Sequence, residues 1–285
     1  MPYAKLLSHR LRGFSDIEHS ESALKNACTT DIPYLEIDTR VSADGDIYVF
    51  HDPVFKSGDV GLPFTTTPSD VLNQAIYPNG ESLLSLRKAL EIFLDRRVRS
   101  QKLCIDIKDF GFEEGYLALI RNFDLESHVC FVSWIPQSLS KLHTLGTICP
   151  LVLSHWNIHR FATLGKFLTK VMNRHLLSFK NYVLMGRSRA LTHLGSFVQG
   201  YQHTLIAQEL PAELEELLAS SRGGICVHHM LVSRNLLKYC KRKNLQLWIF
   251  NVDTTVDYLK YARTTDIDVV FCDNAPTVMA DLRQG

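Results

Sequence analysis

The chain has 285 residues, of which 46% are hydrophobic and 21% charged, and its formal net charge is +1. A chain of this length and composition can bury a substantial core and needs no disulfide or structural metal in order to fold. The near-neutral charge, and the lack of any RRM, KH or helix-turn-helix signature, exclude nucleic acid as the expected partner. Lys5 and Arg10 interrupt the N-terminal apolar residues, and no run approaches the roughly 18 apolar residues of a membrane span. We expect a globular protein that is neither secreted nor membrane-spanning.

The seven cysteines are scattered along the chain, without a C-x-x-C pair or zinc-type spacing. An odd number at such positions is typical of reduced thiols, so we expect a cytoplasmic protein. The sequence does not indicate an oligomeric state.

Eight short apolar runs are suited to buried parallel strands. They cover residues 3–9, 34–38, 102–108, 128–133, 149–154, 224–229, 245–251 and 268–273. Segments with helical periodicity lie between most of them, at 22–28, 85–97, 113–123, 136–145, 233–243 and 255–264. Eight strand–helix repeats predict an α/β fold, a (β/α)8 TIM barrel formed by residues 1–285 as one domain. The alternative is a doubly wound open sheet, but no G-x-G-x-x-G follows the first strand.

Two longer segments interrupt the repeats. The first, about 52–82, is rich in Gly, Pro and Thr and predicts a small insertion after the second strand, with Pro68 as the first residue of a short helix. The second, about 155–205, belongs to a stretch from Ser127 to Gln208 without any Asp or Glu. Residues 159–179 of this basic segment have the spacing of a helix that could contact an anionic membrane. We favour the alternative, a barrel helix with a solvated basic side.

Glu36 and Asp38 are two residues apart in an apolar strand, so their side chains share one face. Two sheltered carboxylates raise each other's pKa unless a positive group lies between them. Mg²⁺ or Ca²⁺ fits a carboxylate-only cluster better than zinc does. The alternative is a pair of rim residues that form ion pairs with Arg10 or Arg40.

The third strand repeats this pattern with Asp106 and Lys108. A third carboxylate would complete a metal site, and Lys108 could contact an anionic oxygen. The alternative is an Asp106–Lys108 ion pair that only closes the barrel mouth. His9 and His51 lie at two more expected strand ends, where they could form an acid/base pair around a metal-bound phosphate.

These residues belong to motifs that follow one another in a fixed order. The motifs are His9-Arg10 with Gly13, Glu18-His19-Ser20, Glu36-Ile37-Asp38, Ser42-Ala43-Asp44-Gly45, His51-Asp52, Asp106-Ile107-Lys108, Trp248 with Asn251, and Asp273 to Pro276. In this order and with these separations, the chain resembles the glycerophosphodiester phosphodiesterase family over nearly its full length. We expect the Asp44-Gly45 turn to fold the chain back, so that His51 lies near the barrel mouth.

The resemblance implies a TIM barrel with an insertion after His51. It also implies hydrolysis of glycerophosphodiesters, small-molecule substrates, to glycerol 3-phosphate and an alcohol, aided by Mg²⁺ or Ca²⁺. Carried onto matching positions, the metal ligands are Glu36, Asp38 and Asp106, the general base and acid are His9 and His51, and the phosphate is bound by Arg10 and Lys108. Trp248 could form a wall of the substrate site or belong to the barrel core. The alternatives are lysophospholipase D-like or phospholipase-like action on membrane lipid, and a non-catalytic barrel that binds phosphodiesters.

The sequence departs from the family pattern at three places. Asp106 replaces a Glu, which shortens the third ligand by one methylene group. His19 replaces an Asn, which removes an amide from the first loop or the metal surroundings. Leu11 and Arg12 are inserted before Gly13, and we expect Arg12 to be a solvated charge rather than a second phosphate ligand.

Overall fold

The computed structural model describes residues 4–98, 100–157, 182–186, 203–206, 210–264 and 266–284. The side chains of residues 156–157, 182–186 and 203–206 are outside this description. Within the described part, no helix combines the length and apolar character needed to cross a membrane.

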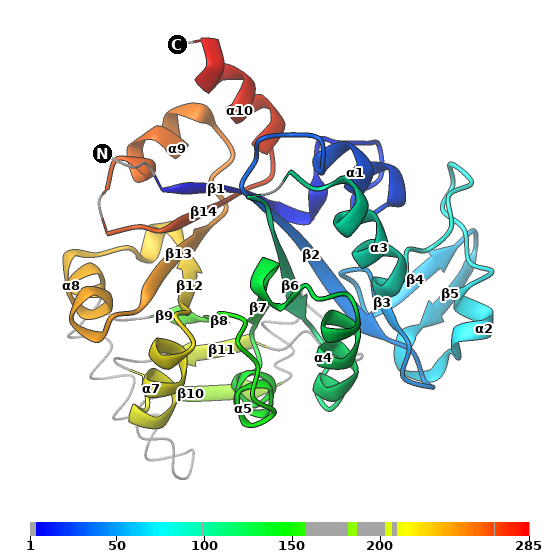
Figure 1. Cartoon of the computed structure of the whole chain (residues 1–285), viewed down its shortest axis with the longest axis horizontal. Helices are drawn as coiled ribbons and strands as arrows, with labels where there is room; N and C mark the ends of the chain where they lie inside the picture. The colour runs from blue at the N-terminus through cyan, green and yellow to red at the C-terminus, as the bar shows by residue number, and fades with distance from the viewer. Residues whose placement is uncertain are drawn as a thin grey trace.

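Eight parallel strands form a closed barrel (Figure 1). They are β1 (Lys5–Ser8), β2 (Tyr34–Val41), β6 (Lys102–Ile107), β7 (Val129–Ser133), β8 (Leu151–Ser154), β12 (Gly224–His228), β13 (Gln246–Phe250) and β14 (Val269–Cys272). The barrel closes because β1 pairs in parallel with both β14 and β2. Each strand corresponds to one of the eight predicted runs, so the prediction of a (β/α)8 TIM barrel is confirmed.

Helices follow the strands around the barrel. They are α1 (Glu21–Ala27), α3 (Leu86–Arg96), α4 (Glu113–Asn122), α5 (Pro136–Thr144), α7 (Ala212–Ser220), α8 (Arg234–Lys243), α9 (Thr255–Ala262) and α10 (Ala275–Gln284). The helices α1, α3, α8 and α9 begin after a Ser or Thr whose side-chain oxygen accepts a backbone N–H three residues further on. This N-cap bond satisfies one of the free amides of the first turn. The six predicted helices are confirmed. No segment of the sequence was named as helical at the positions of α7 and α10.

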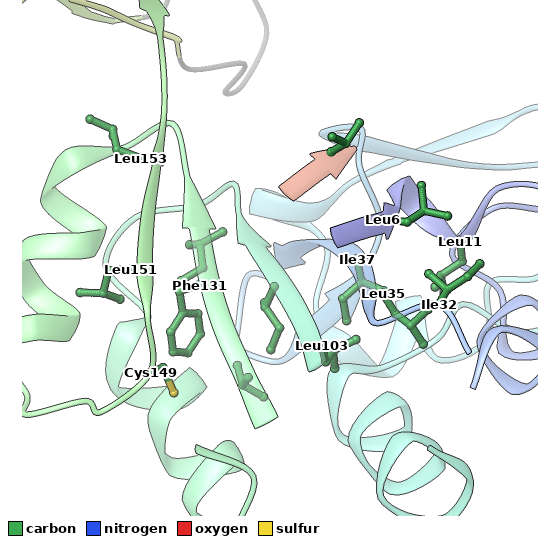
Figure 2. Close-up of a cluster of buried hydrophobic side chains, with 14 of the residues drawn as sticks. Leu6, Leu11, Ile32, Leu35, Ile37, Leu103, Phe131, Cys149, Leu151 and Leu153 are labelled. Atoms are coloured by element: carbon green, nitrogen blue, oxygen red, sulfur yellow. The ribbon is translucent and has the colours of Figure 1, made fainter. Parts of the chain in front are cut away.

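The strands are buried on both faces, with a different cluster on each. Residues such as Leu35, Ile37 and Leu103 point outward into the main core between the barrel and its helices, and Figure 2 shows them beside Ile32. The alternate residues point into the barrel, where they form a second cluster. Its members are Leu7, Tyr34, Cys104, Cys130, Val132, Val152, Cys226, Trp248, Val269 and Phe271. The barrel interior is therefore a packed floor, and the buried carboxylates Glu36, Asp38 and Asp106 lie toward its carboxyl end.

The predicted insertion after the second strand is confirmed. It begins after β3 (Ile47–Val49), which pairs antiparallel with β2, and contains the hairpin of β4 (Val54–Ser57) and β5 (Val60–Pro63), followed by the 3-10 helix η2 (Phe64–Thr66) and α2 (Ser69–Leu72). Figure 1 shows these elements together at the edge of the molecule. They have a small core of their own, formed by Tyr48, Phe55, Phe64, Leu72, Ala75, Tyr77 and Leu83.

The position predicted for Pro68 was wrong by one residue. Pro68 has extended backbone angles (φ −72°, ψ 161°) and forms the N-cap of α2 rather than its first residue. Pro68 has no side-chain acceptor for the first helical amide, that of Ser69. This amide donates to the Asp44 carboxylate, at 2.9 Å from Oδ1. A carboxylate from the β2–β3 turn thus caps this helix, which local sequence could not reveal.

The predicted basic segment, about 155–205, lies largely outside the described residues. Its described parts are β9 (Trp156–Asn157), β10 (Tyr182–Gly186) and β11 (His203–Ile206), which form a separate three-stranded sheet. The amphipathic helix predicted at 159–179 falls outside the described residues.

We predict that Gln101→Ala lowers the free energy of unfolding by about 3 kcal/mol. The buried Gln101 amide donates to the carbonyl oxygens of Thr30 (2.8 Å) and Ile32 (3.1 Å), while its Oε1 accepts the amide of Val98 (3.0 Å). These bonds join the turn before β2 to the start of β6. Urea denaturation measures the change, with Gln74→Ala in the exposed turn after α2 as the control. A loss no larger than that of the control would contradict this account.

Candidate functional site

The three predicted metal-binding carboxylates lie together at the carboxyl end of the barrel. Glu36 and Asp38 point inward from β2, and Asp106 is paired in register with Asp38 on the neighbouring strand β6. All three side chains are buried. The period-two repeat of the strand places Glu36 and Asp38 on one face, as the sequence predicted.

The loop after β1 folds over these carboxylates. His9, Arg10 and Leu11 form the 3-10 helix η1, and both Arg10 and Leu11 have left-handed backbone angles (φ 55°). Two consecutive residues of this kind are strained, and such strain is common at functional sites. The turn lets the Arg10 amide donate to Glu36 Oε2 at 2.8 Å and brings the Arg10 Nε within 3.1 Å of Asp38 Oδ2.

The ammonium of Lys108 lies between the other two carboxylates. Its Nζ is 2.7 Å from Asp38 Oδ1 and 2.6 Å from Asp106 Oδ2. The ion pairs considered as alternatives to a metal site, Arg10–Asp38 and Asp106–Lys108, are therefore both present. Asp106 Oδ1 is buried without a hydrogen-bond partner, and the buried Asp38 Oδ2, although 3.1 Å from Arg10 Nε, accepts no hydrogen bond. Two such oxygens beside the Glu36 carboxylate fit a divalent cation.

Burial and charge drive the pKa values of the three carboxyls apart. Burial, with the nearby Asp38 and Asp106, raises the pKa of Glu36 well above its usual range. Burial would raise the pKa of Asp38 too, but Lys108 and Arg10 hold it well below its usual range. Burial raises the pKa of Asp106 to about 6, although Lys108 opposes this. In the absence of a metal ion, Asp38 is the most firmly ionised of the three.

His19 also belongs to the site. From the sequence, its only expected effect was the loss of the Asn side-chain amide that it replaces. It is fully buried, and its Nε2 accepts the amide N–H of Asp38 at 3.2 Å. Its backbone is left-handed (φ 60°), a conformation in which Asn and His are enriched. The replacement of Asn by His was the feature of the sequence that could have indicated a role for His19 in the site. Ligand atoms of His19, Glu36 and Asp38 all lie within 4.8 Å of one another.

His9 is oriented by the last strand of the barrel. Its Nδ1 is hydrogen bonded to a carboxylate oxygen of Asp273, which directly follows β14. The other oxygen of Asp273 accepts a hydrogen bond from Arg12, which also donates to Glu18. The prediction that Arg12 is a solvated charge was therefore wrong, since it is paired with two carboxylates. Asp273 belongs to one of the motifs named from the sequence, but its contact with His9 was not predicted, because that contact depends on the closure of the barrel between β14 and β1.

His51 reaches the same region through the β2–β3 hairpin, as predicted. Gly45 has φ +96°, which makes the tight turn possible, and the Phe50 amide returns to donate to Asp38 O at 3.0 Å. The buried Arg40 donates to the carbonyl of His51 at 2.8 Å. The His51 Nδ1 lies 2.7 Å from Asp52 Oδ1. Burial lowers the pKa of His51 to about 4, although Asp38 and Asp52 oppose this.

Trp248, the predicted substrate contact, lies in the floor of the barrel. Only 1% of its surface is exposed, its Nε1 donates to Gln246 at 2.8 Å, and its indole packs against Tyr34 and Phe271. The half-buried Phe250, two residues further along β13, lies nearer the barrel mouth and packs against His228. Contact between Trp248 and a substrate stays a prediction.

Scans against protein-family models and curated proteins found no match. Solved structures do match. A glycerophosphodiester phosphodiesterase from Parabacteroides distasonis is 14% identical, with a TM-score of 0.67 over 99% of this chain and 98% of that one. One from Agrobacterium tumefaciens is 16% identical, with a TM-score of 0.62 over 97% and 99%. This chain has the fold of glycerophosphodiester phosphodiesterases.

A third match of this fold is an Oleispira antarctica phosphodiesterase in complex with its product sn-glycerol-3-phosphate. It is 17% identical, with a TM-score of 0.66 over 99% of this chain and 97% of that one. The likeness to glycerophosphodiester phosphodiesterases thus extends over essentially the whole length of both chains.

We predict that Lys108→Met lowers the free energy of unfolding by about 3 kcal/mol in EDTA, because Asp38 and Asp106 lose the buried charge between them. A divalent cation should restore part of this loss, because it can neutralise the same oxygens. Chemical denaturation with and without Mg²⁺ or Mn²⁺ measures both effects. The control is Lys88→Met, which breaks an exposed pair with Glu91 on α3 and should change stability by less than about 0.5 kcal/mol. Equal effects of the two variants would contradict the prediction.

We predict a pH dependence from His51. Its pKa in the folded metal-free protein is lowered to about 4, whereas an unfolded histidine titrates near 6.5. The unfolded state therefore binds a proton first as the pH falls, so His51 should reduce stability between about pH 6.5 and 4. An NMR titration of the ring in EDTA tests this. Asp52→Asn should lower the midpoint further because it removes a hydrogen bond that raises the pKa. A midpoint near 6.5 would refute the prediction.

Proposed function

We propose that the protein is a metal-dependent phosphoric diester hydrolase of the glycerophosphodiester phosphodiesterase family, which converts glycerophosphodiesters to glycerol 3-phosphate and an alcohol. One observation carries the proposal. Two histidines, each with Nδ1 hydrogen bonded to a carboxylate, join a cluster of buried carboxylates and two cations at the catalytic end of a TIM barrel.

His9 and His51 are proposed as the general base and general acid. A carboxylate on Nδ1 holds a ring in one orientation and makes Nε2 the atom that exchanges a proton with the substrate. We assign proton removal from the nucleophile to His9 and proton donation to the leaving alkoxide to His51. The pKa of His51 is low in the metal-free protein, and a phosphate anion beside the ring would raise it.

Arg10 and Lys108 are proposed to bind the phosphate. Burial opposes their charge, but Asp38 with Glu18 raises the pKa of Arg10, and Asp106 with Asp38 raises that of Lys108. Both side chains therefore stay positively charged over the physiological range. Cations held at the barrel mouth can pair with the phosphoryl oxygens as negative charge develops on them.

Glu36, Asp38 and Asp106 are proposed to surround a divalent cation. The buried Asp106 Oδ1, which has no hydrogen-bond partner, and the buried Asp38 Oδ2, which accepts no hydrogen bond although it lies beside Arg10, support this. Mg²⁺ and Ca²⁺ are the ions that a set made only of carboxylates favours. Such an ion would polarise a phosphoryl oxygen and stabilise the charge of the transition state.

A lysophospholipid is a second candidate substrate. Phe110, which follows β6, is 52% exposed, and Met230, which follows β12, is 60% exposed. Residues after barrel strands lie on the catalytic face, so these apolar side chains could contact an acyl chain. The reaction would then release choline or ethanolamine from the lipid headgroup.

A panel of soluble glycerophosphodiesters and lysophospholipids, read by product release, tests the proposal. We expect glycerol 3-phosphate from the soluble diesters, loss of activity in EDTA, and a 10²- to 10⁴-fold lower kcat in His9→Ala and in His51→Ala. His143→Ala, on the exposed side of α5, is the control and should retain full activity.

Other outcomes separate the alternatives. Choline or ethanolamine from lysolipids alone would favour the second candidate. Activity that survives both EDTA and His51→Ala would refute the mechanism. Substrate binding without turnover would indicate a non-catalytic barrel.

A further inference from the structure

The compact ligand group at the barrel mouth differs from the set expected from the sequence. Across the described residues, the group whose possible ligand atoms lie within 4.8 Å of one another consists of His19, Glu36 and Asp38. Asp106 is outside this group. The third side chain next to Glu36 and Asp38 is therefore an imidazole rather than a carboxylate.

Asp106 is held away from that group by its own partner. Its Oδ2 is 2.6 Å from the Lys108 ammonium, and its side chain is one methylene shorter than a glutamate at the same place. Its remaining buried oxygen, Oδ1, has no hydrogen-bond partner, so it can still accept a hydrogen bond from a water molecule. This arrangement suits a water-mediated contact with an ion better than a direct one.

We propose that the metal ligands of this protein are His19, Glu36 and Asp38, and that its cofactor is a transition-metal ion of the Mn²⁺, Co²⁺ or Zn²⁺ type rather than Mg²⁺ or Ca²⁺. The inference rests on the proposed function, whose metal dependence it keeps, but it replaces Asp106 by His19 as a direct ligand and Mg²⁺ or Ca²⁺ by a transition-metal ion. The two departures from the family motif are then complementary, since the shortened Asp106 withdraws from the ion and His19 takes its place.

The state of His19 is that of a ligand. The ring is fully buried, and its Nε2 accepts a hydrogen bond from Asp38 N–H, so the ring proton is on Nδ1, and the same Nε2 lies 3.4 Å from Asp38 Oδ2. At 3.2 Å that hydrogen bond is long, and an ion next to Asp38 would compete for the Nε2 lone pair.

The carboxylates provide the second part of the argument. The buried Asp38 Oδ2 lies 3.4 Å from His19 Nε2 and 3.1 Å from Arg10 Nε, and it accepts no hydrogen bond. Glu36 adds a carboxylate within the same group. Imidazole nitrogen together with carboxylate oxygen suits Mn²⁺, Co²⁺ or Zn²⁺, whereas Mg²⁺ and Ca²⁺ are bound almost entirely by oxygen.

Metal binding and spectroscopy of the whole protein test this inference without an activity assay. Calorimetry should give tighter binding for Mn²⁺ and Co²⁺ than for Mg²⁺ and Ca²⁺. Pulsed EPR of the Mn²⁺-loaded protein should show ¹⁴N coupling from a directly bound ring. In His19→Asn, which retains a residue suited to the left-handed backbone, the coupling should disappear and Mn²⁺ affinity should fall about 100-fold.

The controls keep the test independent of misfolding. His143→Asn, on the exposed side of α5, should leave the coupling and affinity unchanged. His19→Gln serves as a second variant if thermal unfolding shows that His19→Asn is not folded. The double variant His19→Asn/Asp106→Glu restores a set of oxygen ligands, so it should bind Mg²⁺ more tightly than His19→Asn does.

The remaining outcomes overturn the inference. Absence of ¹⁴N coupling in the wild type, or coupling that persists in the His19 variants, would show that His19 is not a ligand. Either result, if Mg²⁺ still binds and supports hydrolysis, leaves the proposed function intact. Failure of the wild type to bind any divalent cation would refute both the inference and the metal dependence of the proposed function.

Discussion

The mouth of this barrel depends on the neutralisation of buried carboxylates. Glu36, Asp38 and Asp106 would repel one another in a space with little water, and two cations, Arg10 and Lys108, make that arrangement tolerable. The strained turn after β1 brings the Arg10 amide and guanidinium to Glu36 and Asp38. The conformation of the first loop is thus coupled to the charge of the second strand.

The barrel itself could be predicted from the sequence because its strands are buried on both sides. Such strands appear as short, almost continuous apolar runs, and Val129–Ser133 is one of them. The helices α7 and α10 were harder to recognise. Helix α7 follows Pro211 without a side-chain cap, and α10 begins only three residues after β14 ends at Cys272. The capping of α2 by Asp44 is a tertiary contact that no local pattern contains.

The candidate site also contains residues that could be predicted from the sequence and contacts that could not. Glu36, Asp38 and Lys108 could be predicted because a two-residue spacing on a strand fixes which side chains share a face. Asp273 lies 264 residues from His9 in sequence, and only the closure of the barrel brings them together. His19 required knowledge of a left-handed backbone position and of the space beside Asp38. The position of His19 in the motif could not show whether the change from Asn to His adds a metal ligand or removes one.

The position of Lys108 has a further thermodynamic consequence. Its ammonium lies between Asp38 and Asp106 and neutralises carboxylates that the proposed metal ion would also neutralise, so Lys108 would compete with that ion for Asp38. Any ion that takes over Asp38 weakens the hold on Lys108 and leaves that charge available for an anion. By linkage, an anion that draws Lys108 away strengthens the binding of the ion by the same factor. Cation and anion are thus expected to bind cooperatively, through a single lysine that each of them displaces from the carboxylates.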